Sequence, residues 1–324
     1  MIGSRSIAMT KARGGCCLPA MPKPSHAPPQ IVTRASGPAN AGIFARLPGG
    51  WFQMGADDAP HPEDGEGPAR QVFVDPFEIA QTAVTQQDFA AFVRQTGYRT
   101  VAERAGGSFV FFALAGSATP AQSVQQAPWW RMVDGASWRC PNGPNHPTTA
   151  RAPAQPDHPV THIAHEDALA FCHWAGVRLP HEAEWEFAAR GGLDAQPFPW
   201  GETLTPEGAH RCNIWQGRFP DHNTAEDGFS GTAPVTSFAP NGFGLFNMTG
   251  NVWEWTADRF TNLHSPRPVR NPRGPLNGAT WVAKGGSYLC HASYCARYRT
   301  SSRQPLAPDT TTGNLGFRVA RDVA

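Results

Sequence analysis

The sequence predicts a single irregular α+β domain, in which short helices and strands are joined by many ordered turns. Its 324 residues include 33 glycines, 32 prolines and 11 tryptophans, while only 16% are charged. Long amphipathic helices need alanine, leucine, glutamate and lysine, so this composition argues against a helical bundle. Clear helix patterns also vanish after residue 192, where turn signals recur.

Two parts are expected along the chain. Residues 1–40 are rich in proline, alanine, serine and glycine and lack apolar periodicity, which is typical of a flexible N-terminal extension. Residues 41–324 are expected to form one domain. A chain of this length can bury a substantial core without disulfides.

Three helices are predicted from their end signals, over residues 86–96, 166–175 and 181–190. The first has Thr85 as N-cap with Asp88 three residues later, and Gly97 marks its end. Short strands are predicted at 51–54, 71–74, 253–255, 281–283 and 316–320. The region between the first two helices contains Trp129, Trp130 and Trp138 and is interpreted as a long functional loop.

The charge balance excludes several classes of function. The formal net charge is +1 and the basic residues are scattered, so neither a nucleic-acid partner nor a membrane surface is expected. No apolar run approaches the roughly 18 residues that span a bilayer. No secretory signal is expected at the start. We therefore expect a cytoplasmic protein, with a monomer as the default state.

The chain has seven cysteines, an odd and widely spaced set that does not predict a disulfide framework. Cys290 and Cys295 are the exception, because they lie five apart in a segment rich in glycine and tyrosine. Such a pair suits a disulfide, half of a zinc site, or a two-thiolate site for a soft ion such as Cu(I). Spacing alone leaves these alternatives open.

Oxygen-bearing side chains gather in three runs, at 213–217, 223–229 and 247–255. Amides and carboxylates mixed with glycine suit calcium, which takes six to eight oxygen ligands. The same residues also serve ordinary turns, and the spacing matches no EF-hand loop.

Four phrases together resemble the formylglycine-generating enzyme family, whose fold is C-type-lectin-like. They are Arg-Leu-Pro-His-Glu-Ala-Glu-Trp-Glu at 178–186, Phe-Pro-Trp-Gly at 198–201, Gly-Asn-Val-Trp-Glu-Trp at 250–255 and Asn-Leu-Gly-Phe-Arg at 314–318. The resemblance covers roughly residues 43–322. Because relatives with other activities share these phrases, the discriminating feature is Gly-Gly-Ser-Tyr-x-Cys-x-x-Ser-Tyr-Cys at 285–295, which resembles the catalytic segment of the oxidases, here of the prokaryotic type.

The resemblance implies a copper-dependent oxidase. Cys290 and Cys295 would bind Cu(I), and four other residues would line the pocket for O₂ and the substrate thiol: Ser287, Trp253, Tyr294 and Asn314. The implied substrate is a cysteine within Cys-x-Pro-x-Arg of an unfolded or nascent sulfatase, which becomes formylglycine at the expense of O₂ and a thiol reductant. The tryptophans of the long loop are expected near the peptide groove.

The resemblance also implies two structural calcium sites. One would use the side chains of Asn213 and Asp227 with the carbonyl oxygens of Ile214 and Phe229. The other would use the side chains of Asn247 and Glu254 with the carbonyl oxygens of Gly250 and Val252.

The sequence departs from secretory members of the family, which carry additional disulfides. The matching positions pair Cys172 with Val319 and Ala189 with Thr300, so neither bridge can form. This departure supports a cytoplasmic protein in which Cys172 is a buried core thiol. No role is assigned to the remaining cysteines: Cys16, Cys17, Cys140 and Cys212.

Three alternatives share the fold class. A non-catalytic binding module would be expected to have lost one or both cysteines of the pair. An iron-dependent sulfoxide synthase would need an additional helical domain with a histidine-rich iron site, which the first 40 residues are not expected to supply. A protein activator without redox chemistry is the third, and only an assay distinguishes it.

Overall fold

The computed structural model describes residues 19, 32–34, 41–115, 121–124, 127–144, 146 and 155–323. The predicted extension over residues 1–40 falls almost wholly outside this part of the chain. The first strand begins at Phe44, close to the predicted start of the domain. No helix among the described residues is long and apolar enough to cross a membrane.

All three predicted helices are present, and their ends follow the local signals. The helices are α1 (Gln86–Thr96), α2 (Val101–Ala105), α3 (His165–Ala175) and α4 (Glu182–Arg190). Two single 3-10 turns, η1 (Pro62–Asp64) and η2 (Pro206–Gly208), complete the helical elements of the described residues. Thr85 and Asp88 form a reciprocal capping box at α1, which satisfies N–H groups that the first helical turn leaves free.

A four-stranded sheet carries the residues singled out by the sequence. Its order is β13 (Arg303–Leu306), β12 (Trp281–Lys284), β10 (Trp253–Arg259) and β14 (Leu315–Phe317). Strand β10 pairs in parallel with β14, with Trp253 opposite Leu315, and antiparallel with β12. This pairing brings the segments that precede β10 and β14 together with the segment that follows β12.

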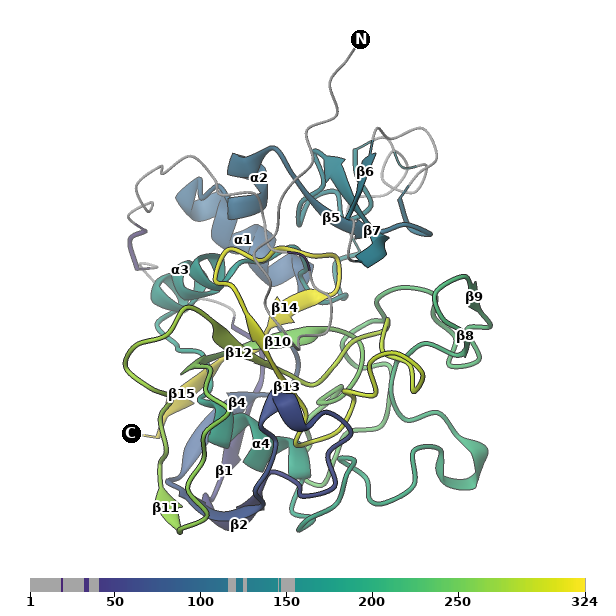
Figure 1. Ribbon diagram of the computed structural model, residues 1–324. Helices are drawn as coiled ribbons and strands as arrows, with labels where there is room; N and C mark the ends of the chain where they lie inside the picture. The colour runs from purple at the N-terminus through teal and green to yellow at the C-terminus, as the bar shows by residue number, and fades with distance from the viewer. Residues whose placement is uncertain are drawn as a thin grey trace.

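The other strands form small sheets around this one (Figure 1). The first comprises β1 (Phe44–Leu47), β4 (Phe77–Ala80) and β15 (Ala320–Asp322), and the second comprises β2 (Gly50–Met54), β3 (Arg70–Val74) and β11 (Val269–Arg270). A two-stranded ribbon comprises β8 (Gly217–Arg218) and β9 (His222–Asn223). In Figure 1, α1, α2 and α3 lie on one side of β10 and β14, and α4 lies on the other with β1 and β2.

The interpretation of the tryptophan-rich region as a long loop is wrong for its described part. Strands β5 (Gly107–Phe111), β6 (Ala121–Val124) and β7 (Ala127–Asp134) form an antiparallel sheet with β7 in the middle. Trp129 and Trp130 lie on β7, and Trp130 is fully buried in a hydrophobic cluster that also contains Phe111 and Trp215. Burial of this apolar surface stabilises a strand whose local sequence carries weak alternation.

Two smaller differences concern element ends. The predicted strand at 316–320 is interrupted: residues 316 and 317 belong to β14, which pairs with β10, and Ala320 begins β15, which pairs with β4. Helix α2 was not predicted, although Thr100 and Glu103 form the same kind of capping box as at α1 and Gly106 ends the helix in the left-handed region.

Candidate active site

The two cysteines lie on a tight segment that follows β12, here called the cysteine loop (residues 285–296). Gly285 and Gly286 both adopt positive φ, at 95° and 75°. A Cβ atom on Gly286 would lie 2.3 Å from the carbonyl oxygen of Arg297, so only glycine permits the two ends of the loop to approach this closely. The glycine pair therefore closes the cysteine loop at its base.

The loop brings the two thiols into contact. Cys290 and Cys295 have their Sγ atoms 2.8 Å apart, and both side chains are buried. This separation exceeds the roughly 2.05 Å of a disulfide bond, and both residues are free thiols. The structure thus brings two buried free cysteine side chains into direct contact.

Backbone hydrogen bonds set the shape of the loop. The carbonyl oxygen of His291 accepts the N–H groups of Tyr294, Cys295 and Ala296 at 2.8 to 3.0 Å. Ala296 has φ of 51°, a left-handed conformation that is unusual for a residue with a Cβ. Outside the loop, the backbone N–H of Trp215 donates to the carbonyl oxygen of Cys290 over 3.0 Å.

A small cavity opens beside Cys290. Its volume is about 10 Å³, room for the centre of one water-sized molecule. The lining residues are Trp129, Trp130, Trp253, Ser287, Leu289, Cys290, Tyr294 and Asn314. Five of the six predicted catalytic residues therefore meet at one cavity, and the sixth, Cys295, contacts Cys290 directly.

Polar groups at this cavity form a short chain. The side chain of Asn314 donates from Nδ2 to Ser287 Oγ at 2.8 Å, and its Oδ1 accepts from Thr312 Oγ1 at 2.8 Å. The backbone carbonyl oxygen of Asn314 accepts the backbone N–H of Trp253 at 2.9 Å. The indole Nε1 of Trp253 is buried and has no hydrogen-bond partner among the described residues. A small polar molecule in the cavity would meet an oriented hydroxyl within otherwise dry walls.

Aromatic rings fix Tyr294 at the rim of the cavity. Its ring stacks on Phe219 with centroids 4.5 Å apart and meets Trp129 edge-on at 4.7 Å. The sequence did not single out Phe219, which lies between the short strands β8 and β9. Its only sequence signal was an aromatic side chain in a glycine- and proline-rich turn.

The first predicted calcium set has a buried acceptor that lacks a donor. Asn213 is fully buried, and its Oδ1 has no partner among the described residues. Asp227 accepts the N–H groups of Ile214 and Phe229, both at 3.0 Å. The side-chain amide nitrogen of Gln216 contacts both the Ile214 carbonyl oxygen and Asp227 Oδ2. The Ile214 carbonyl oxygen and the Asp227 carboxylate thus lie around one positively polarised N–H group, an arrangement of oxygens that would also suit a cation.

The second predicted set fits calcium less well. Asn247 has a buried Oδ1 without a partner in the described part of the chain. Glu254, however, already accepts two nitrogen atoms of Arg318 and the indole N–H of Trp185 at 2.7 to 3.3 Å. Gly250 and Val252 lie in the turn that leads into β10. Glu254 is thus largely satisfied without a metal.

The remaining described cysteines lie elsewhere. Cys172 is a buried thiol on α3, packed in the main core that also contains Val319, and Cys140 is half-buried. Cys212 is buried near the pair, beside Tyr298. Among the residues that the structure describes, no group of three or more histidine, cysteine, aspartate or glutamate side chains could hold a metal ion.

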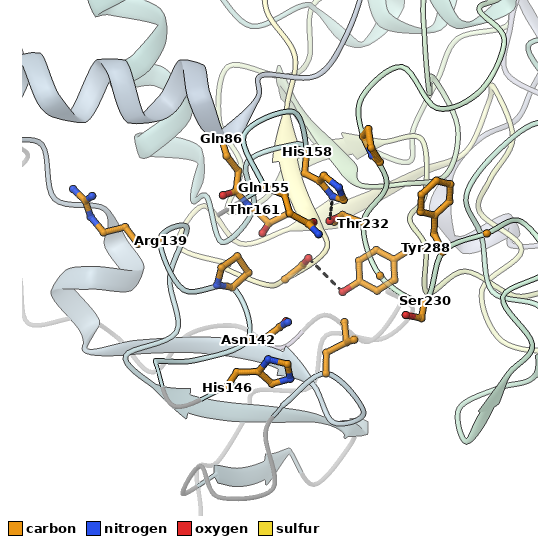
Figure 2. Close-up of a pocket in the computed structure, with 17 residues that line it drawn as sticks. Gln86, Arg139, Asn142, His146, Gln155, His158, Thr161, Ser230, Thr232 and Tyr288 are labelled. Carbon is orange, nitrogen blue, oxygen red and sulfur yellow. Dashed lines mark hydrogen bonds between the residues drawn. The ribbon is translucent and has the colours of Figure 1, made fainter. Parts of the chain in front are cut away.

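A second and larger pocket, of about 590 Å³, is shown in Figure 2. Polar side chains such as Gln86, His158 and Thr161 line it, and neither cysteine of the pair does. Tyr288 of the cysteine loop lines this pocket and donates its hydroxyl to the Gly313 carbonyl oxygen at 3.3 Å. Because no thiol reaches this pocket, the small cavity at Cys290 is the candidate active site.

The model of the sulfatase-modifying factor enzyme 1-like domain matches residues 32–323. A formylglycine-generating enzyme of Thermomonospora curvata is 54% identical over 283 residues, which cover 85% of this chain and 92% of the relative. One from Streptomyces coelicolor is 51% identical, with 94% and 96% covered. A Bos taurus relative named inactive Cα-formylglycine-generating enzyme 2 is 44% identical, with 86% and 87% covered.

Among solved structures, PvdO from Pseudomonas aeruginosa aligns with a TM-score of 0.64 over 92% of this chain and all of PvdO, at 24% identity. This likeness shows the fold and supports the expected irregular α+β class.

Proposed function

The chain belongs to the sulfatase-modifying factor enzyme family, and we propose that it is a formylglycine-generating oxidase acting on a cysteine of sulfatases. The observation that carries the proposal is the contact between the two buried free thiols, Cys290 and Cys295, at a cavity lined by oriented polar groups. Two bacterial relatives named formylglycine-generating enzyme support the proposal, because they are more than half identical over most of the chain.

The net reaction balances with one O₂ and two thiols. The substrate side chain –CH₂–SH loses two electrons and becomes –CHO, and its sulfur leaves as H₂S. Two molecules of thiol reductant supply two more electrons and become a disulfide. Both oxygen atoms of O₂ are reduced to water by these four electrons, and one water molecule supplies the aldehyde oxygen when the sulfur leaves, so that one water is formed in total. The proposed substrate segment is Cys-x-Pro-x-Arg in an unfolded or nascent sulfatase.

The donor set at the cysteine pair fits Cu(I). Two thiols in contact, with no cluster of three or more other ligand side chains within the described residues, suit a soft ion of low coordination number. When bound by Cys290 and Cys295, copper would supply the one-electron chemistry that lets O₂ react with a closed-shell thiol.

The chain's own residues have separate tasks in this proposal. Ser287 and Asn314 orient a small oxygen species through hydrogen bonds, which is most effective where water is excluded. Trp253, Trp130 and Leu289 keep the cavity dry. Tyr294, held between Phe219 and Trp129, forms the rim against which the substrate segment would pack.

Calcium is proposed as a structural ion at Asn213 and Asp227, where a buried acceptor without a donor supports it. A second ion at Asn247 has weaker support, because Glu254 is already paired with Arg318. Since reduced thiols are needed for the reaction, we propose a reducing compartment, the cytoplasm, and a monomeric protein.

The rival function is a binding module on the same fold. Family membership does not exclude it, since a relative that is 44% identical is named inactive. The discriminating feature is the intact thiol pair, because a module that only binds peptide has no need for two reduced cysteines in contact.

The test uses protein loaded with Cu(I) and incubated in air with a thiol reductant and the peptide Leu-Cys-Thr-Pro-Ser-Arg. Mass spectrometry then follows conversion of the peptide cysteine to the aldehyde. Conversion is expected to vanish in Cys290→Ser and in Cys295→Ser. It is expected to persist in Cys172→Ala, a matched control that removes a buried thiol from another part of the core.

Two negative results have different meanings. Failure to convert the peptide, by protein that binds one Cu(I), would point to another substrate. A lack of Cu(I) binding, together with unchanged peptide affinity in the cysteine variants, would contradict the oxidase and favour the binding module.

A further inference from the structure

The exit of the cysteine loop is held by a segment far away in the sequence. His61 lies 234 positions before Cys295, and its ring Nε2 donates to the Cys295 carbonyl oxygen over 2.6 Å. Three residues later, the buried carboxylate of Asp64 pairs with the guanidinium Nε of Arg297. Residues on both sides of Ala296 are therefore bound by side chains from one short segment.

The residue between these contacts is conformationally unfavourable. Ala296 lies in the left-handed region with φ of 51°. Such a conformation persists only when the surrounding structure enforces it, and it tends to occur at functional sites. Within the loop, the N–H of Ala296 donates to the His291 carbonyl oxygen over 3.0 Å. The hydrogen bond from His61 to Cys295 and the ion pair between Asp64 and Arg297 hold this conformation from outside the cysteine loop.

The segment around η1 is itself rigid. Gly65 ends η1 with φ of 66°, and its N–H donates to the Pro62 carbonyl oxygen at 3.1 Å. Arg303 on β13 donates from Nη1 to the carbonyl oxygens of Asp64 and Gly65, at 3.0 and 3.2 Å. The segment is thus fixed to the same sheet from which the cysteine loop emerges.

We propose that His61 and Asp64 are positioning residues for the Cys295 thiol, which they hold against Cys290 by fixing the backbone on each side of Ala296. This inference rests on the proposed function for its biological meaning. The geometry that it explains, the 2.8 Å contact between two thiols, does not depend on that function.

His61 is the better residue to test, because its side chain is 23% exposed, while Asp64 is fully buried and its removal would break a buried ion pair with Arg297. His61→Leu removes the donor to Cys295. His61→Gln restores a donor, because the glutamine amide nitrogen reaches a position close to that of histidine Nε2.

Two readouts report thiol placement directly. The first is Cu(I) affinity, measured by competition with a chromophoric chelator. The second is the rate at which a mild oxidant joins Cys290 to Cys295 in metal-free protein, followed by peptide mapping. His61→Leu is expected to lower each by about tenfold, the scale of one hydrogen bond, and His61→Gln is expected to recover most of the loss.

A control separates positioning from general destabilisation. Thr85→Ala removes the N-cap of α1, far along the chain from the loop, and lowers stability without touching the thiols. It is expected to leave both readouts unchanged. Cu(I) affinity and disulfide rate equal to wild type in His61→Leu would overturn the proposal.

The same variants and readouts distinguish a failure of the proposed function from a failure of the positioning role. If wild type converts no peptide, but His61→Leu still loses Cu(I) affinity and slows disulfide formation, the proposed peptide substrate is wrong and the positioning role stands. If wild type converts peptide and His61→Leu lowers kcat with unchanged peptide KM, both stand.

Discussion

Trp215 donates its backbone N–H to the carbonyl oxygen of Cys290, so the segment that follows Asn213 of the first candidate calcium set is hydrogen-bonded directly to one of the paired cysteines. The flanking residues, Ile214 and Gln216, both contact Asp227. A change at Asp227 therefore has a short path to Cys290 through one residue. A change at the first candidate calcium set is therefore expected to affect the cysteine loop as well.

Removal of calcium is expected to lower both thermal stability and Cu(I) affinity. A cation that binds only the folded state adds about 3 kcal/mol to the free energy of unfolding when its free concentration is a hundred times its dissociation constant. Differential scanning fluorimetry with and without a calcium chelator, together with the chelator competition for Cu(I), measures the two effects. Asp227→Ala is expected to have the melting temperature and Cu(I) affinity of wild type treated with the chelator, and neither value should change when the chelator is added.

Asp221→Ala is the matched control, because Asp221 is an exposed carboxylate of the nearby turn that pairs with Arg218. It should keep the full response to the chelator. A wild type whose melting temperature ignores calcium would contradict the calcium site, whatever the behaviour of copper.

The hydrogen bond from Asn314 to Ser287 is expected to matter for turnover and not for metal binding. Neither residue supplies sulfur, and the Ser287 hydroxyl loses its orientation when Asn314 is removed. Asn314→Ala and Ser287→Ala should each lower kcat by about 100- to 1,000-fold, as for other oriented donors, with Cu(I) affinity unchanged.

A double-variant cycle tests whether the two residues act as a unit. The double variant is expected to be little worse than either single one, because contacting groups are not additive. Fully additive losses in kcat would mean that Ser287 and Asn314 act independently, contrary to this account.

Local signals predicted the helices and the cysteine segment well. Thr85, Asp88 and Gly97 define both ends of α1 through contacts within the helix, so a short sequence window contains all the information. The pair Thr100 and Glu103 carried the same signal for α2. The paired thiols followed from a contiguous pattern.

Contacts between distant segments could not be predicted. Strand β7 is stabilised by burial of Trp130 in one cluster with Phe111 and Trp215, and the last of these lies 85 positions away (215 − 130). His61 meets Cys295 across 234 positions, and nothing near His61 marks it as a partner. The predicted site residues lie together because β10 and β14 pair, a register that the sequence did not supply.

Acid is expected to destabilise the protein through a buried histidine. Burial lowers the pKa of His162 to about 4 from 6.5, and its ring contacts Ser108 Oγ and the Pro141 carbonyl oxygen. Between pH 6.5 and 4 the unfolded chain binds a proton that the folded chain does not, so stability falls as pH falls through this window. At pH 5 this group alone lowers the free energy of unfolding by about 2 kcal/mol.

Urea unfolding at pH 7 and pH 5 measures the effect, and His162→Asn should reduce the difference between the two. Asparagine suits this position because His162 has φ of 62°, which few residues tolerate. Part of the acid sensitivity should remain, since burial also lowers the pKa of His165 to about 4. A variant with an undiminished pH dependence would show that His162 is not the buried neutral base inferred here.

Cys212 is expected not to bind copper, although it lies near the pair. Burial raises the pKa of Tyr298 to about 12, and Cys290, Cys212 and Cys295 contribute to the same shift. Burial also raises the pKa of the Cys212 thiol, with Asp227 adding to it. Because a metal binds the thiolate, a thiol held in its protonated form is a poor ligand.

Cys212→Ala should therefore bind one Cu(I) with wild-type affinity and convert peptide at the wild-type rate, with a stability loss of about 1 kcal/mol from the lost sulfur. Cys290→Ala, measured beside it, should lose both properties. A weaker Cu(I) complex in Cys212→Ala would instead assign a third protein sulfur to the metal.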